Sequence, residues 1–206
     1  MKSTSIEMRT VRPHIDKEEI ANLPVAQFQG KVYVLLTERE AKSAVEYLLR
    51  QRVVGIDTET RPSFKKGKVN NIALLQVSTD DQCFLFRLCR MGIPDCIKTL
   101  LESKSLIKVG LSLKDDFLQL NRSESEKIAP QAYIELQTDV KQIGIEDMSL
   151  QKIFANLFGK RISKRQQLSN WEADILSEAQ QIYAATDAWA CLKIYEEINR
   201  IEQTQS

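Results

Sequence analysis

The sequence predicts a single α/β domain in which a mixed β-sheet forms first and helices dominate afterwards. Short apolar runs rich in β-branched residues, which are typical of strands, alternate with helical segments up to about residue 110. From about Leu136 to Gln203 the pattern is mostly helical. A length of 206 residues fits one compact domain with a sizeable core. Together these observations indicate one α/β domain.

The predicted strands follow one another along the first half of the chain. Each is an apolar run bounded by polar or turn-forming residues. They are expected at residues 32–36, 53–56, 71–78, 82–86 and 106–109. Asp80-Asp81 separates the third run from the fourth and suits the turn of a hairpin.

Helical patterns occupy the segments between and after these strands. Helices are expected at about 16–22, 37–50, 94–102, after Gly110 and at about 177–200. Thr37 and Glu40 have the spacing of a capping box, which fixes the start of the second helix. Residues 1–30 contain Pro13 and Pro24, and we expect them to form an irregular amino-terminal arm.

The composition argues against several kinds of catalysis. With 29 basic and 28 acidic side chains the formal net charge is +1, so any affinity for nucleic acid must come from local basic patches or bound metal. The four cysteines form no C-x-x-C pair and the one histidine is His14, which argues against a zinc site and against histidine-based nucleophilic catalysis. The cysteines are expected to be buried small hydrophobes in a reducing compartment. Carboxylates must therefore carry any chemistry.

Neither a targeting segment nor a membrane span is visible. Residues Met1 to Lys17 are polar and of mixed charge, without the apolar centre of a signal peptide. No stretch approaches the roughly 18 apolar residues that a membrane helix requires. We therefore expect no membrane association and a cytoplasmic location.

The first candidate for chemistry is Asp57-Thr58-Glu59, at the end of the apolar strand Val53 to Ile56. Side chains two positions apart on a strand point to the same face, so the two carboxylates converge. Acids at such a place are costly unless a divalent metal neutralises them. The competing interpretation is a solvated strand end, because D-x-E occurs often by chance.

Two further candidates lie on helices. Asp115 and Asp116 begin the helix after Gly110, where the helix dipole alone would favour acids. Tyr183 and Asp187 are four residues apart in the last helix and therefore lie on one face of it. A packed tyrosine and a salt-bridged aspartate would give the same pattern, so this segment alone does not decide between structure and function.

The three candidates together match the needs of metal-assisted phosphodiester hydrolysis. That reaction uses several carboxylates to hold two divalent ions about 4 Å apart. Mg²⁺ or Mn²⁺ suits a site made only of oxygen ligands. A tyrosine hydroxyl beside the ions can orient the attacking water and help to remove its proton.

Three segments, in order and at suitable separations, resemble the exonuclease motifs of the DEDD superfamily: VVGIDTETRPSF, IKVGLSLKDDF and YAATDAWACLKIY. A tyrosine at 183 resembles the tyrosine subclass, which includes RNase D and the Werner-type exonucleases. The resemblance spans about residues 30–200 and extends to Arg61-Pro62, Leu74-Leu75-Gln76 and the segment 169–172. It implies an RNase H-like mixed five-stranded sheet with helices on both sides, and a 3′→5′ exonuclease domain at 31–203 after the arm.

The resemblance also implies roles for individual residues. Asp57, Glu59 and Asp187 would ligate the more tightly held ion, and Asp57 would bridge to the second. Asp116 would act on the second ion directly or through water, and Tyr183 would orient and activate the attacking water. Asp115 receives no catalytic role.

Two basic clusters are candidates for contacts with the nucleic-acid backbone, since basic loops near a phosphodiester site can hold phosphates. One comprises Arg61, Lys65, Lys66 and Lys68, and the other Lys160, Arg161, Lys164 and Arg165. Thr58, between the first two acids, is a further candidate for such a contact. Solvated surface charge is the alternative for both clusters. Trp171 and Trp189 are expected to be core residues and not platforms for stacking bases.

The sequence therefore predicts a metal-dependent 3′→5′ exonuclease that releases nucleoside monophosphates, with DNA favoured over RNA because the flanking segments resemble the Werner type. Single-stranded or recessed 3′ ends are the expected substrates, and whether a helicase acts as partner stays open. One alternative is an RNase D-like exoribonuclease. Another is a catalytically silent nucleic-acid-binding scaffold, and a third is an ordinary α/β protein with accidental acids.

Overall fold

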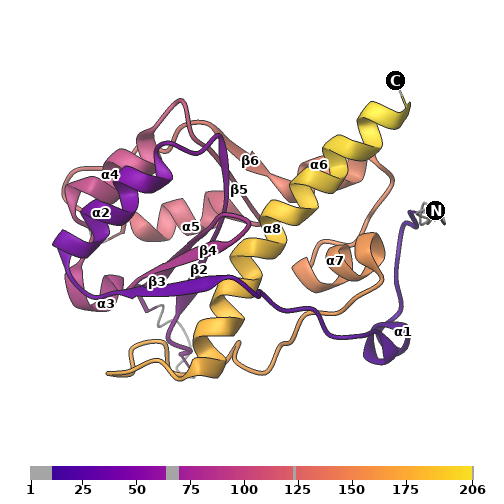
Figure 1. Cartoon of the computed structure of the whole chain (residues 1–206), viewed down its shortest axis with the longest axis horizontal. Helices are drawn as coiled ribbons and strands as arrows, with labels where there is room; N and C mark the ends of the chain where they lie inside the picture. The colour runs from indigo at the N-terminus through magenta and orange to yellow at the C-terminus, as the bar shows by residue number, and fades with distance from the viewer. Residues whose placement is uncertain (1–10, 64–69, 123, 206) are drawn as a thin grey trace, which may run out of the picture.

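The computed structural model describes residues 11–63, 70–122 and 124–205. A six-stranded mixed sheet runs through the molecule, with helices on both faces (Figure 1). Its spatial order is β1 (Lys31–Leu35), β4 (Gln82–Phe86), β3 (Ile72–Ser78), β2 (Val53–Thr60), β5 (Ile107–Gly110) and β6 (Tyr133–Glu135). β3 pairs antiparallel with both β2 and β4, and the other neighbours are parallel.

The predicted α/β class is confirmed, but the expected count of five strands is wrong. The additional strand is β6, whose three residues pair in parallel with β5. A segment this short has no apolar run or alternation that distinguishes it from a loop. Its strand conformation comes from the tertiary pairing and not from a local pattern.

The helices agree with the sequence pattern in most places. They are α1 (Lys17–Asn22), α2 (Glu38–Leu48), α3 (Leu88–Met91), α4 (Asp95–Glu102), α5 (Leu113–Leu120), α6 (Leu136–Gln142), α7 (Leu150–Phe158) and α8 (Glu178–Gln205). The capping box at the start of α2 is present, because Thr37 accepts from the Glu40 N–H and the Glu40 side chain accepts from the Thr37 N–H. The short helix α3 was not expected from the sequence.

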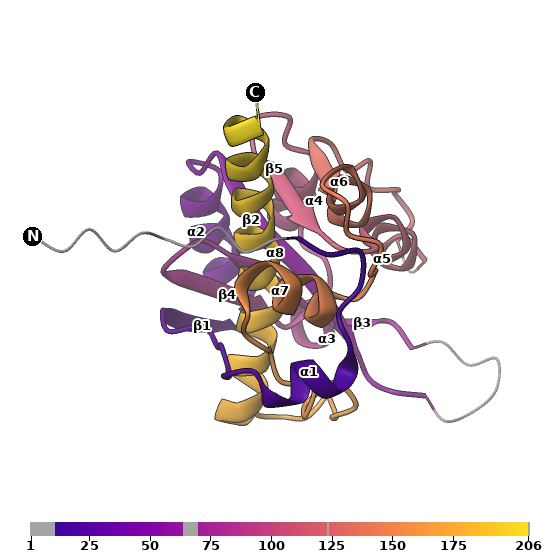
Figure 2. The ribbon, with the colours of Figure 1, turned by 90° about the vertical axis from the view of Figure 1, so that its right-hand side faces the viewer.

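The two faces of the sheet are covered by different helices. α2, α4 and α5 pack on one face against alternate strand residues such as Val54, Ile56 and Val77. α8 crosses the opposite face, with α6 and α7 beside it (Figures 1 and 2). Since neighbouring strand residues point to opposite faces, Gly55, Asp57 and Glu59 are directed toward α8.

Close contact between β2 and α8 sets the geometry of the site. A Cβ atom at Gly55 would lie 1.9 Å from the Ala188 carbonyl oxygen, so only glycine fits there. The facing turn of α8 carries the buried small residues Ala184, Ala185 and Ala188. Because the backbones approach this closely, Asp187 is brought against the end of β2.

The described part of the arm packs on the domain. Ile15 and Phe28 are each only 1% exposed. Val25 forms a parallel bridge with Arg161, and the Phe28 N–H donates to the Thr186 hydroxyl at 3.0 Å. Figure 2 shows the arm with α1 beside α7. Residues 11–30 therefore extend the cores around α7 and α8.

Other predictions about single residues have mixed outcomes. Trp171 is fully buried and Trp189 packs against Phe28 and Phe154, which confirms both as core residues. Cys83 and Cys191 are buried as expected, whereas Cys96 is only partly buried. Cys89 is exposed, so the expectation is wrong there, because the short helix α3 turns Leu88 and not Cys89 toward the core. Within the described residues, none of the helices combines the length and apolar character that crossing a bilayer requires.

Candidate active site

Three carboxylates converge at the end of β2. Asp57 and Glu59 project from the strand, Asp187 projects from α8, and their ligand oxygens all lie within 4.8 Å of one another. The convergence follows from strand alternation, which gives Asp57 and Glu59 a common face, and from the glycine contact that brings α8 onto that face. The structure thus brings together three of the predicted acids from segments about 130 residues apart.

The carboxylates are in an environment that disfavours their charge. Burial, followed by repulsion from Asp187 and Asp116, raises the pKa of Asp57. Burial, followed by repulsion from Asp57, Asp187 and Asp116, raises the pKa of Glu59 to about 10. Burial also raises the pKa of Asp187 to about 7. Asp187 Oδ1 is buried and has no hydrogen-bond partner among the described residues. An all-oxygen donor set with an orphaned carboxylate atom fits a divalent cation such as Mg²⁺ or Mn²⁺.

Asp116 lies next to this cluster but is not one of the three that converge within the described residues. It occupies the first turn of α5, and its Oδ1 accepts a hydrogen bond from the Thr58 hydroxyl at 2.7 Å. Burial raises the pKa of Asp116 to about 6, against the opposing effect of the Thr58 hydrogen bond. Asp115, on the same turn, is exposed.

Tyr183 lies one helical turn before Asp187 on α8, as its spacing predicts. The side chain is 8% exposed and its ring centroid is 5.9 Å from that of Trp171. Burial, followed by the charges of Asp187 and Glu59, raises the pKa of the phenol well above its ordinary range. The hydroxyl group is therefore held protonated beside the acids.

The acids line a cavity of about 320 Å³ together with residues that the sequence did not single out. Those with polar side chains are Ser112 just before α5, Gln137 on α6, Ser149 and Gln151 at the start of α7, and Gln167 in the segment before α8. Met148 and Cys191 line the same cavity. These polar residues form no sequence motif with the acids. Only their position in the folded protein shows that they belong to the cavity.

The predicted basic residues have different surroundings. Lys164 lines the acid cavity. Arg161 Nε donates to the Leu23 carbonyl at 3.0 Å, which ties the loop to the arm, and Arg61 pairs with Glu172 at 3.2 Å. Lys160 is exposed. Lys65, Lys66 and Lys68 lie outside the described residues.

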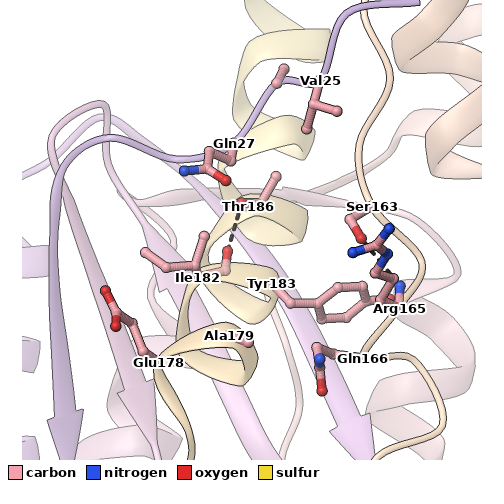
Figure 3. A pocket seen from close by; sticks show the side chains of 11 residues that line it. Val25, Gln27, Ser163, Arg165, Gln166, Glu178, Ala179, Ile182, Tyr183 and Thr186 are labelled. Atoms are coloured by element: carbon pink, nitrogen blue, oxygen red, sulfur yellow. Dashed lines mark hydrogen bonds between the residues drawn. The ribbon is translucent and has the colours of Figure 1, made fainter. Parts of the chain in front are cut away.

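A second cavity of about 360 Å³ lies on another side of Tyr183 (Figure 3). Arg165 and Gln166 line it from the segment before α8, and Val25 and Gln27 line it from the arm. Figure 3 shows the Tyr183 ring reaching from α8 toward Arg165 and Gln166. The neighbours Lys164 and Arg165 therefore line different cavities, which both include Tyr183.

Comparison with known proteins agrees with this arrangement. Residues 32–202 match the family model described as 3′-5′ exonuclease. The chain is 32% identical over 194 residues to the mouse bifunctional 3′-5′ exonuclease/ATP-dependent helicase WRN, covering 89% of this chain and 14% of that protein. It is 30% identical over 188 residues to an Arabidopsis thaliana 3′-5′ exonuclease, covering 84% and 65% respectively. The chain thus spans less than two thirds of either relative.

Solved structures share the fold at lower identity. The Aedes aegypti Nibbler EXO domain superposes with a TM-score of 0.77 at 18% identity, covering 88% of this chain and 94% of that one. Escherichia coli RNase D, an exoribonuclease, superposes with a TM-score of 0.69 at 21% identity, covering 82% and 46%. The layered sheet and its helices are therefore common to these proteins.

Proposed function

The chain belongs to the 3′-5′ exonuclease family, and on that premise we propose that it hydrolyses phosphodiester bonds at the 3′ ends of nucleic acids, releasing nucleoside monophosphates. The observation that carries the proposal is the convergence of Asp57, Glu59 and Asp187 within 4.8 Å. All three line one cavity with Tyr183, so the acids and the phenol face a common space. A water and a phosphodiester placed there would lie within reach of both.

Two divalent ions, Mg²⁺ or Mn²⁺, are the proposed cofactors. Asp57, Glu59 and Asp187 would hold the first ion, and Asp57 with Asp116 would hold the second, directly or through water. When bound, the ions favour ionisation of the attacking water and neutralise the charge that develops on the phosphate. Their charge also relieves the mutual repulsion of the buried carboxylates.

Tyr183 would orient the attacking water through its hydroxyl group. The phenol stays protonated because burial and the nearby acids oppose its ionisation. A protonated hydroxyl both donates and accepts hydrogen bonds, which suits a group that positions water and relays its proton. Packing against Trp171 fixes the ring and thereby the direction of the hydroxyl.

The proposed substrate is DNA with a single-stranded or recessed 3′ end. Similarity to the Werner-type flanking segments supports DNA. Lys164 is the proposed contact to the backbone, because among the described basic side chains it lines the acid cavity. Selection between DNA and RNA depends on contacts near the sugar. Gln137, Ser149 and Gln151 are the proposed source of such contacts, because they offer hydrogen-bonding groups in the acid cavity.

The test uses 5′-labelled single-stranded DNA, recessed-end DNA and matched RNA, resolved on denaturing gels with Mg²⁺, with Mn²⁺ and with chelator. Wild-type protein is compared with Asp116→Asn and with Asp115→Asn, a matched control at an exposed neighbour. We expect a one-nucleotide ladder that requires metal, is lost in Asp116→Asn and persists in Asp115→Asn. Full-length substrate in every lane from folded protein would instead support a silent scaffold, and faster decay of RNA would overturn the preference for DNA.

A further inference from the structure

Thr58 stands between two acids of the cluster and lines the acid cavity with them, but its hydroxyl group is directed toward α5. Its neighbours Asp57 and Glu59 face α8, whereas Thr58 shares the face of Val54 and Ile56, where α5 packs. There its hydroxyl donates to Asp116 Oδ1 at 2.7 Å. The bond joins side chains 58 positions apart and links β2 directly to the first turn of α5.

The hydrogen bond from Thr58 restrains Asp116 against two acidic neighbours, Asp115 and Glu135. Asp115 precedes it on the same turn, and Glu135 caps the helix by accepting from the Ser112 and Leu113 N–H groups at 2.7 and 2.9 Å. Repulsion from these two carboxylates changes which rotamers of Asp116 are favoured, because the Asp116 carboxylate avoids them. A hydrogen bond between a hydroxyl donor and a charged acceptor is strong enough to select one rotamer. It engages Oδ1 and leaves Oδ2 for another partner.

We propose that Thr58 is a positioning residue for Asp116 and, through it, for the more weakly held divalent ion of the site. The inference rests on the proposed function, since it assigns Asp116 to that second ion. Thr58 lies on β2 next to Asp57. The hydrogen bond from Thr58 therefore fixes Asp116 to the same strand that carries Asp57, the other acid proposed for the second ion. The first ion, held by Asp57, Glu59 and Asp187, does not depend on the Thr58 hydroxyl.

The test replaces the hydroxyl while keeping the shape of the side chain. Thr58→Val removes the donor, Thr58→Ser keeps it, and Thr60→Val is the matched control, with the same change on the same strand. Mn²⁺ binding is measured by calorimetry and by electron paramagnetic resonance on protein without nucleic acid. We expect wild-type protein to show a tight and a weaker ion, and Thr58→Val to weaken only the weaker one by about 10–100-fold, the usual effect of losing a partner that orients a ligand.

Thr58→Ser and Thr60→Val should both retain the wild-type isotherm. A wild-type isotherm for Thr58→Val would overturn the proposal, and so would an equal loss in Thr58→Ser, because the lost methyl group would then be responsible. Circular dichroism on each variant establishes that the fold is retained. The gel assay on wild-type protein tests the proposed function separately. A metal-dependent ladder from wild-type protein would support that function even if Thr58→Val bound both ions normally.

Discussion

At the scale of single residues, the site is a set of carboxylates that the fold holds together against their mutual repulsion. Asp57, Glu59 and Asp187 are brought within 4.8 Å by covalent and packing constraints on β2 and α8. Burial adds to the free-energy cost of ionising these carboxylates, as the raised pKa values of all three groups indicate. Acids that lower the stability of the fold but suit a bound ion are expected at a site where function is favoured over stability.

The first prediction concerns Asp57. Asp57→Asn removes a buried carboxyl group whose ionisation burial and the neighbouring acids oppose, so the metal-free protein should become more stable at neutral pH. Each kcal/mol gained raises Tm by about 2–4 °C in a domain of this size. Thermal unfolding in chelator measures the gain. Nuclease activity should fall below detection, and the rise in Tm that Mn²⁺ gives wild-type protein should be lost. A variant that is folded and still active would contradict the assignment of Asp57 to the metal.

Tyr183 gives a second prediction at this scale. Tyr183→Phe keeps the ring that packs on Trp171 and removes only the hydroxyl. We expect kcat to fall by about 100-fold or more, as for other groups that position or relay a proton, with Mn²⁺ affinity and Tm close to wild type. Single-turnover kinetics and a binding isotherm separate the two effects. Unchanged kcat would remove Tyr183 from the chemistry and leave it a packing residue.

At the scale of elements, the contact between β2 and α8 determines whether a site exists. Gly55→Ala should destabilise the protein by more than the ~1–3 kcal/mol of ordinary overpacking, because the new Cβ would lie 1.9 Å from a main-chain oxygen of Ala188. Chemical denaturation measures the loss. The second substitution Ala188→Gly should not restore stability, since it leaves that oxygen in place. Restoration by Ala188→Gly would mean that side chains, and not backbones, set the distance.

The irregular segment before α7 supplies a prediction about pH. Burial opposes the charged form of Asp147, but hydrogen bonds from Lys152 and from the Ile15 N–H, together with the Lys152 charge, outweigh burial and lower the pKa of Asp147. A carboxyl group with a lowered folded-state pKa stabilises the fold above its unfolded value, about 4, and this contribution is lost as the pH falls through the folded value. Asp147→Asn should therefore lower Tm at pH 7 and reduce the loss of Tm between about pH 5 and pH 2. Parallel Tm profiles for the two proteins would exclude this role.

The elements also show what sequence alone could and could not predict. Strand alternation and helical spacing were sufficient to place Asp57 with Glu59 and Tyr183 with Asp187. No local pattern predicts that β2 packs against α8. The prediction that these two pairs form one site came from the resemblance to a family. β6 and the cavity residues Gln137, Ser149 and Gln151 were missed because only tertiary contacts define them. Arg161, expected at a nucleic-acid surface, has a partner in the arm at Leu23, a contact between segments more than 100 residues apart.

At the scale of the whole molecule, the arm and the domain form one packed unit over the described residues. Ile15 is 1% exposed, and its N–H donates to Asp147 immediately before α7. Farther along, the Phe28 N–H donates to Thr186, the neighbour of Asp187. The arm therefore contacts α8 and the segment just before α7, and residues of these two helices are among those that line the acid cavity. A segment attached at two such places should unfold together with the domain.

Ile15→Ala tests that cooperativity. Removing a fully buried isoleucine side chain costs about 2–5 kcal/mol, and if the arm and the domain fold as one unit the whole cost should appear in the single unfolding transition of the domain. Val25→Ala is the matched control, because Val25 is 53% exposed and should change Tm little. Differential scanning calorimetry and hydrogen exchange at the amides of α7 give the two readouts. A domain transition unchanged in Ile15→Ala, with early exchange confined to residues 11–22, would show instead that the arm unfolds independently and that its contacts with α7 contribute nothing to the stability of the site.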